Sequence, residues 1–410
     1  MVPKLRFGGF KEEWTMTLLS KLATKITDGT HDTPDTTSEG IPYLTAIHVK
    51  DGYIDYKNCY YLDKLTHSLI YKRCNPEKND LLIVNIGAGT GTCALNTVDY
   101  EFSLKNVALV KPNKNKVYPF YLLQVQRKNA KKLFHELTSG GAQPFLSLKE
   151  IGKLKIPLCQ YDEQTKIADF LSSVDDKITL LNQQYDLLCQ YKKGMMQKIF
   201  SQEVRFKDEN GEMFPAWQEN SLSSLGNAYN GLTGKTAEDF GKGVFYITYK
   251  QIFDNRIINP KGFGLVKITK NEKQNKVEYG DLFFTTSSET PDEVAFCSVF
   301  LETELIDCYL NSFCFGYRVK NIDKSDPVFL SFLFRSGYFR AKVKTLAQGS
   351  TRYNISKTQF MMLSVNIPVT KEQTKIANFL SALDDKIAVK KAELDKLKIW
   401  KQGLLQQMFV

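Results

Sequence analysis

The chain has 410 residues, of which 42% are hydrophobic and 24% are charged, close to the averages for a globular protein. This composition excludes a mainly disordered chain, a collagen-like repeat and a low-complexity protein. Lys and Arg number 55 against 45 Asp and Glu, giving a net charge of +10, which favours a polyanionic partner such as nucleic acid or an anionic membrane surface.

The sequence gives no sign of a membrane span or an export signal. No run of 18 apolar residues occurs, so no transmembrane helix is expected. The first residues lack the apolar core of a signal peptide. The eight cysteines form no C-x-x-C pair and the four histidines are not spaced as ligands. We therefore expect reduced thiols, a cytoplasmic location and no zinc site.

The first half begins as a mixed α/β segment with short strands. Strands are predicted at Tyr43–Val49, Asp80–Asn85 and Val107–Lys111, because each run is rich in β-branched or aromatic residues and is bounded by Gly, Asn or Asp. A helix is predicted at Tyr118–Leu137, followed by a polar turn that ends at Gln143.

A long helix follows from Glu163 to about Gly194. Apolar residues recur along it at helical spacing and define one face. Its 30 or so residues correspond to roughly 45 Å. A helix of this length with one apolar stripe needs a partner to be stable in water.

The second half repeats this order. Strands are predicted at Val244–Tyr249, Asp281–Thr286 and Cys314–Val319, a helix at Pro327–Leu346, and a final long helix from Glu372. The starts of the two long helices match at 13 of 16 positions, residues 163–178 against 372–387. The chain is therefore a tandem duplication, and each long helix is the natural partner of the other in an antiparallel pair.

The fold class that follows is α+β: two tandem α/β modules separated by two long helices that form an antiparallel coiled coil, with an internal pseudo-two-fold repeat. The expected domains are 1–158, a central helical region 159–202, 203–368, and a C-terminal helical region 369–410. The identity between the helix starts includes polar positions off the apolar stripe, among them Gln164, Asp175 and Asp176 with their counterparts. Packing alone tolerates change there, which favours two copies of one docking partner.

Several loops carry groups suited to nucleic acid. Gly lets a backbone approach phosphate, Ser, Thr, Lys and Arg donate to phosphate oxygens, and Asn, Gln, Arg and His reach base edges. An ordinary solvated turn is the alternative for each loop. The candidate DNA contacts are Thr30, His31, Arg73, Gly87, Gly89, Thr90, Gln143, Lys235, Lys250, Gln251, Thr286, Ser287, Ser288, Arg352 and Tyr353.

No complete catalytic constellation is present. The run Gly231–Thr236 lacks the first Gly of a phosphate-binding loop, because Tyr229 stands at that position. Asp326-Pro-Val-Phe329 is one residue from the Asp-Pro-Pro-Phe of amino-methyltransferases, but Tyr118-Pro119 is its counterpart in the first half, which indicates a helix-start Pro. The chain by itself is not expected to be a catalyst.

The duplicated helix starts, each preceded by Ile-Pro (Ile156-Pro157 and Ile367-Pro368) and each following an unlike module, resemble the specificity subunit of Type I restriction-modification systems. The resemblance covers the whole chain. It implies that each module is a target recognition domain for one half of a bipartite, gapped, asymmetric site in double-stranded DNA. It also implies two modification (methyltransferase) subunits and restriction subunits as partners, and no catalytic centre or cofactor of its own.

By this resemblance, the positions expected to hold the methyltransferase subunits are Gln164, Ile167, Phe170, Asp175, Gln373, Ile376, Phe379 and Asp384. The apolar ones are equally candidates for the intramolecular coil. Two other classes of function stay open: a self-sufficient DNA-modifying enzyme, and a duplicated protein-binding scaffold that does not touch DNA.

Overall fold

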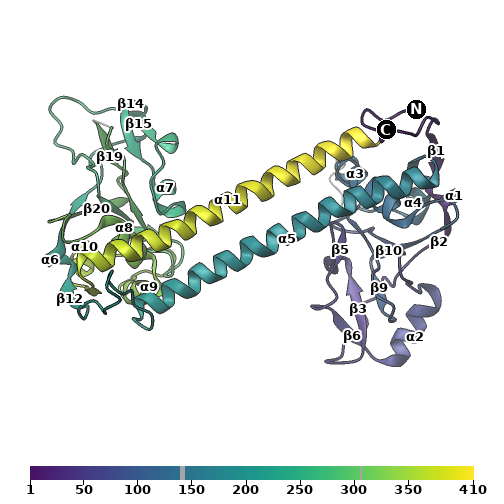
Figure 1. Cartoon of the computed structure of the whole chain (residues 1–410), viewed down its shortest axis with the longest axis horizontal. Helices are drawn as coiled ribbons and strands as arrows, with labels where there is room; N and C mark the ends of the chain where they lie inside the picture. Colours follow the sequence, from purple (N-terminus) through teal and green to yellow (C-terminus); the bar gives the residue numbers. More distant parts are fainter. Residues whose placement is uncertain (139–143, 305–306) are drawn as a thin grey trace. The chain divides into compact units, whose positions relative to one another are not determined.

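The computed structural model describes residues 1–138, 144–304 and 307–410. They form two compact units. Unit 1 contains Met1–Gln183 and Lys391–Val410, and unit 2 contains Gln184–Lys390. Helix α5 (Tyr161–Phe200) begins in unit 1 and ends in unit 2, whereas α11 (Thr370–Met408) begins in unit 2 and ends in unit 1. Each unit thus holds the start of one long helix beside the end of the other, and within each unit the two helix segments run in opposite directions (Figure 1).

Unit 1 places a mixed α/β module on this helix pair. Its main sheet has the order β2-β10-β7-β8, and a second sheet has the order β6-β3-β9, in which β3 and β9 are parallel. The elements are β1 (Thr15–Leu18), α1 (Leu19–Leu22), β2 (Ala23–Asp28), β3 (Ile41–Thr45), η1 (Ala46–His48), β4 (Val49–Lys50), β5 (Tyr53–Ile54), β6 (Tyr60–Leu62), α2 (Lys64–Arg73), β7 (Leu81–Val84), β8 (Cys93–Leu95), β9 (Ser103–Lys105), β10 (Val107–Pro112), α3 (Pro119–Thr138), α4 (Leu148–Lys153) and β11 (Lys155–Leu158).

Unit 2 repeats the topology, with a main sheet β13-β20-β16-β18 and a second sheet β15-β14-β19. The elements are β12 (Gln218–Ser221), α6 (Leu222–Leu225), β13 (Gly226–Asn230), η2 (Ala237–Asp239), β14 (Phe240–Ile247), α7 (Tyr249–Asp254), η3 (Pro260–Gly262), β15 (Gly264–Val266), β16 (Leu282–Thr285), β17 (Ser287–Ser288), β18 (Cys297–Val299), β19 (Cys308–Leu310), β20 (Cys314–Val319), α8 (Pro327–Arg335), α9 (Gly337–Lys344), β21 (Tyr353–Asn354), α10 (Lys357–Met361) and β22 (Ser364–Ile367).

The α+β fold class with its internal repeat is confirmed, and three local predictions need correction. The strand predicted at Tyr43–Val49 stops at Thr45, because a capping box between Thr45 and His48 starts a 3-10 turn. The strand predicted at Val244–Tyr249 gives way to α7, for which Thr248 is the N-cap. The helix predicted at Pro327–Leu346 is two helices, because Ser336 ends α8 and caps α9.

Each unit has a core that joins its module to the helix pair. In unit 1, Leu81 and Tyr121 of the module belong to the same buried cluster as Leu171 of α5 and Leu404 of α11. In unit 2, Phe329 and Leu330 of α8 belong to a cluster with Ile199 of α5 and Ile376 of α11. Full burial of one such side chain contributes about 1.5–3 kcal/mol, which is the stabilisation that the long helices lack in isolation.

Candidate nucleic-acid interface and partner surface

Two distant candidate segments of unit 2 lie side by side beyond the end of β16. Strand β17 pairs with β21, with Ser287 opposite Asn354 and Ser288 opposite Tyr353. The amide of Ile355 donates to the carbonyl of Thr286 at 3.0 Å. The fold therefore brings Thr286–Ser288 next to Arg352–Tyr353, as a single DNA-contact region requires.

Helix α7 completes a groove at this place. The Tyr249 hydroxyl donates to the carbonyl of Ser287 at 2.6 Å, which holds the start of α7 against β17. The resulting cavity of about 640 Å³ combines aromatic, hydroxyl, cationic and acidic side chains. Its lining residues are Tyr249, Phe253, Ser288, Glu289, Glu293, Thr351 and Arg352. Donors, acceptors and aromatic faces in one groove are the groups with which proteins read base edges.

Arg352 is presented to solvent by a tight hairpin. Gln348 and Asn354 exchange two backbone hydrogen bonds, at 2.9 and 2.8 Å. Gly349 has φ +135°, and a Cβ there would lie 2.1 Å from the carbonyl oxygen of Arg352, so this turn requires Gly. Arg352 is exposed, and no described residue forms a hydrogen bond or ion pair with its guanidinium. Burial raises the pKa of Tyr249, and the nearby Arg352 charge partly opposes that rise.

DNA contacts at Gln251 and Lys235 do not fit their surroundings. Gln251 is buried, and its side chain makes two hydrogen bonds to the backbone of Asn259, at 2.8 and 3.0 Å. The Lys235 ammonium is buried too, donating to the carbonyl of Lys267 at 2.6 Å and pairing with Glu272 at 2.5 Å. The hydrogen bond from Lys235 to Glu272 is the main cause that lowers the pKa of Glu272 to about 2. Both side chains serve the fold, whereas Lys250 is exposed and pairs with Asp254 on its own helix.

In unit 1, a buried carboxylate at the end of β2 orients two exposed basic side chains. Asp28 accepts from His31 Nε2 at 2.8 Å and also pairs with Arg73 at the end of α2. The side chains of His31 and Arg73 are 47% and 58% exposed. Thr30 lies beside them through a parallel bridge to Lys105. Asp28 thus brings Arg73 to the same exposed surface as Thr30 and His31.

The Gly-rich loop after β7 repeats the pairing seen in unit 2. Ile86 bridges Phe145, and the amide of Leu146 donates to the carbonyl of Asn85 at 2.8 Å. Gly87 has φ +96° and Gly89 is exposed. Thr90 is buried and donates to the carbonyl of Gly87 at 2.7 Å, so this residue supports the loop and is not itself available to DNA.

Gln143 precedes the strand-like segment that pairs with this loop. It lies outside the residues that the structure describes.

The first polar pair shared by the long helices has an intramolecular role. Glu163 is buried and accepts from Arg6 at 2.7 and 2.8 Å and from the Trp14 indole at 3.2 Å. Glu372 accepts from Arg205 at 3.1 and 2.6 Å and from the Trp217 indole at 3.2 Å. The recurrence of an Arg-Phe pair and a Trp before each module was the signal in the sequence for these contacts.

Gln164 and Gln373 also tie each module to its helix. Gln164 accepts from the amide of Tyr118 and donates to the carbonyl of Cys159, both at 2.9 Å. Gln373 repeats this with Asp326 and Pro368, at 2.9 and 2.8 Å. Gln164 and Gln373 are 1% exposed, and Ile167 and Ile376 are 2% and 0% exposed. A direct role in partner docking is therefore not consistent with their positions, because the fold already uses these groups.

The two aromatic candidates are only partly covered. Phe170 lies edge-on to Phe7 and to Trp400, at 5.7 and 6.1 Å between ring centroids. Phe379 lies edge-on to Phe206 at 5.5 Å. Both are half-buried; Phe170 contacts α11 through Trp400, whereas Phe379 contacts Phe206, which lies beyond the end of α5.

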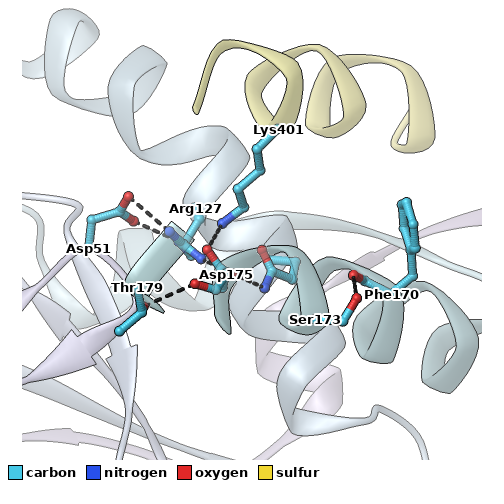
Figure 2. Close-up of polar contacts among 8 residues, drawn as sticks. Asp51, Arg127, Phe170, Ser173, Asp175, Thr179 and Lys401 are labelled. Carbon is cyan, nitrogen blue, oxygen red and sulfur yellow. Dashed lines mark hydrogen bonds and ion pairs between the residues drawn. The ribbon is translucent and has the colours of Figure 1, made fainter. Parts of the chain in front are cut away.

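Asp175 joins both long helices to the module of unit 1 (Figure 2). It pairs with Lys401 of α11, and it accepts from Arg127 of α3 at 2.6 Å. Arg127 also makes a two-pronged contact to Asp51, at 2.7 and 3.0 Å. Burial opposes ionisation of Asp175, but the charges of Arg127 and Lys401 outweigh it, and the pKa of Asp175 lies below its ordinary value.

Asp384 has the matching role in unit 2. It pairs with Lys192 of α5 and accepts from Arg256 at 3.1 and 3.2 Å. The Arg256 guanidinium lies over the Phe332 ring at 3.7 Å and donates to Ser331 at 3.0 Å. Asp175 and Asp384 are thus partly buried centres of ion-pair networks.

Other identical or apolar positions on the helices face solvent. Asp176 and Lys177 on α5 are exposed, as are their counterparts Asp385 and Lys386 on α11. The exposed large apolar residues of the two helices are Tyr161, Leu180, Leu187, Tyr191, Val389, Ile399 and Trp400. A charged pair beside scattered exposed apolar side chains, repeated in the two halves, is a surface on which another protein can pack.

Neither a membrane span nor a metal cluster was found in the described ranges. No helix there is long and apolar enough to cross a bilayer, and no three His, Cys, Asp or Glu side chains are grouped so that they could hold a metal ion.

Comparison with known proteins shows which family this chain is similar to. The model of the Type I restriction modification DNA specificity domain matches residues 11–190 and again residues 216–398. Two similar proteins of Methanocaldococcus jannaschii are the specificity subunits of the type I restriction enzymes MjaX and MjaVIII. The first is 26% identical, over 98% of this chain and 94% of its own length. The second is 26% identical, over 87% of this chain and 85% of its own length.

Solved structures share the fold. The S subunit of a Type I restriction-modification system from M. genitalium matches with a TM-score of 0.59 and 15% identity, covering 100% of this chain and 99% of its own. A chain from a structure on complex assembly and conformational transition of the type I R-M system matches with a TM-score of 0.56 and 14% identity, covering 97% and 98%.

Proposed function

The chain belongs to the Type I restriction-modification DNA specificity family, and from this premise we propose that each of its two modules reads one half of a bipartite, gapped, asymmetric DNA site. The observation that carries the proposal is the repeated pairing beyond β7 and β16. Both units build the same backbone frame there and fill it with different side chains. The same backbone pairing with different side chains is what we expect of two modules that both bind DNA but recognise different base sequences.

The charge of the chain supports DNA as the ligand. In unit 1, His31 and Arg73 are exposed while a buried carboxylate holds them in place. In unit 2, Arg352 projects from its hairpin and Lys250 lies on the neighbouring helix. With a net charge of +10, the electrostatic attraction to phosphate is favourable along the duplex.

The long helices are the proposed docking surface for two methyltransferase subunits. The buried candidates Gln164, Ile167 and their counterparts are replaced in this role by exposed positions, namely Asp176 with Lys177 and Asp385 with Lys386. No described residue forms an ion pair or hydrogen bond with these four side chains. Within the fold, the charge of Asp385 acts on Arg256, but no contact among the described residues explains why all four residues are identical between the helices, whereas a repeated partner does.

The chemistry in this proposal belongs to the partners. The chain selects the site in a cytoplasmic complex, methyltransferase subunits modify it, and restriction subunits join for cleavage. The chain itself then needs no cofactor. A self-sufficient modifying enzyme would instead transfer methyl groups as the purified chain alone. A scaffold without DNA contact would bind its partners with no effect of DNA.

Mapping methylated bases genome-wide, with and without the gene for this chain, tests the proposal. The expected result is one gapped motif that disappears with the gene. DNA binding by the assembled complex should weaken linearly in log affinity against log salt. A continuous motif, or methylation that persists without the gene, would contradict the bipartite reading.

A further inference from the structure

A single carboxylate in each unit holds three elements together. Asp175 binds Lys401 of the opposite long helix and Arg127 of the module. Asp384 binds Lys192 of the opposite long helix and Arg256 of the module. The side chains of Arg127 and Arg256 are 10% and 11% exposed, and those of Asp175 and Asp384 are 28% and 31% exposed, so both contacts are partly shielded from the solvent that weakens surface pairs.

The two arginines do not correspond to each other in the repeat. Arg127 follows the helix-start Pro119 by the same interval at which Arg335 follows Pro327. The charge of Asp384 acts on Arg335, but Arg335 donates its hydrogen bonds to backbone carbonyls, among them those of Ile252 and Asn255, at 3.0 and 2.7 Å. Arg256, the residue after Asn255, makes the contact instead. The same link is built from different residues, so it is not merely a remnant of the duplication.

The linked segment in each unit leads back to the candidate DNA surface. In unit 2, Arg256 follows Asn255, the C-cap of α7, and α7 carries Tyr249 and Phe253 of the groove. In unit 1, Asp51 follows β4 in the turn before β5, and Arg127 lines a small cavity with Asp51, Gly89 and Thr90. Gly52 has φ +85°, and a Cβ there would lie 2.9 Å from the Arg127 guanidinium, so the turn packs directly on this side chain.

We propose that Arg127 and Arg256 are positioning residues, which fix the orientation of each recognition module on the helix pair of its own unit and thereby set the spacing at which the two half-sites are read. This inference rests on the proposed function. Apolar packing between module and helices supplies affinity but is not directional. An Arg fork on carboxylates has a defined planar geometry, so it selects one orientation among those that the core permits.

The test uses the full-length chain in complex with its methyltransferase subunits. Duplexes carry the mapped site with the native spacer, or with one base pair added or removed, and the methylation rate is measured on each. Arg127→Gln and Arg256→Gln should reduce the preference for the native spacer by about tenfold or more, a change of about 1.4 kcal/mol. The half-site sequences should stay the same, because the groups that face the bases are unchanged.

Matched controls separate positioning from stability. Lys111→Gln and Arg318→Gln remove ion pairs to Asp80 and Asp281 inside the same units, and neither pair involves a long helix. These variants should keep the spacer preference. Arg127→Lys, which retains the charge but not the fork, should restore part of the preference. If the Gln variants do not fold, Asp51→Asn removes the two-pronged partner of Arg127 at an exposed position and should give the same relaxation.

An unchanged spacer preference in folded Arg127→Gln and Arg256→Gln complexes would overturn the inference. Loss of half-site sequence preference instead of spacer preference would overturn it too, since that would make the arginines readers of bases. If the wild-type complex methylates no gapped site at all, the proposed function fails first, and the two failures are therefore distinguishable.

Discussion

Asp175 of α5 accepts from Lys401 of α11, while the adjacent Asp176 points to solvent. Both residues recur in the second helix, as Asp384 and Asp385. The adjacent carboxylates Asp175 and Asp176 therefore have different surroundings, and substitutions at the two positions should affect stability differently.

Asp175→Ala should lower the free energy of unfolding by about 3 kcal/mol, because it leaves Arg127 and Lys401 without their shared counter-ion in a partly buried place. Asp176→Ala should change it by no more than about 0.5 kcal/mol. Chemical denaturation of the two variants measures the difference. Equal effects would show that Asp175 is not a centre of the fold.

The pH dependence of stability follows from the same carboxylate. The pKa of Asp175 in the folded chain is lowered by Arg127 and Lys401, whose charges outweigh the effect of burial. Its ionised form therefore contributes stability that is fully present above the ordinary carboxyl value of about 4 and is lost as the pH falls through the lower folded value. Asp175→Asn should flatten the acid limb of a plot of unfolding free energy against pH; an unaltered slope would contradict this assignment.

Much of the fold could be predicted from the sequence, because periodicity and repetition are local signals. The long helices, the strand at Cys314–Val319 and the duplicated order of elements are present as expected. Breaks such as that at Ser336 were missed, since a Ser cap inside an apolar helical pattern is easily read as an ordinary helix position.

The candidate site was predictable only in part. The sequence singled out Thr286–Ser288 and Arg352–Tyr353, but it could not show that β17 and β21 pair them. The sequence analysis also assigned Gln164 to a partner, because Gln164 and Gln373 are identical polar residues off the apolar stripe, and helix packing alone does not explain that identity. Its hydrogen bonds to Tyr118 and Cys159 depend on tertiary contacts that no spacing rule reveals.

Matched insertions of seven residues after Lys177 and after Lys386 should lengthen the spacer of the DNA site. The insertions fall between Asp175 and Lys192 on α5 and between Asp384 and Lys401 on α11, so both ion pairs can re-form. Seven residues add about 10 Å of helix, or about three base pairs at 3.4 Å each. Methylation mapping should return the same half-sites with a longer gap, whereas altered half-sites would refute a helical ruler. An insertion after Lys177 alone lengthens α5 but not α11, so the ion pairs Asp175–Lys401 and Asp384–Lys192 cannot both re-form. The spacer is then expected to be less sharply defined.

Arg352→Ala should weaken recognition of the second half-site alone, by about 1–3 kcal/mol, if the guanidinium contacts a base edge. The comparison is between duplexes that carry substitutions in one half-site at a time. Uniform weakening on all sequences would make Arg352 a phosphate contact. Lys250→Ala, on the neighbouring helix, is the useful companion, because an exposed Lys with a flexible stem is expected to weaken binding without changing sequence preference.

Asp176→Lys and Asp385→Lys should each weaken the binding of one methyltransferase subunit by about tenfold, because reversing a charge places like charges opposite each other in the interface. Titration of methyltransferase subunit onto the full-length chain, followed by mass, gives both affinity and stoichiometry. The double variant should bind both subunits about tenfold more weakly, whereas each single variant should retain one tight site. Full binding of two subunits by the double variant would rule out these exposed carboxylates as docking residues. Neither carboxylate forms a hydrogen bond or an ion pair with a described residue, so stability in the absence of the methyltransferase should stay within about 0.5 kcal/mol of the wild type. This separates a docking defect from unfolding.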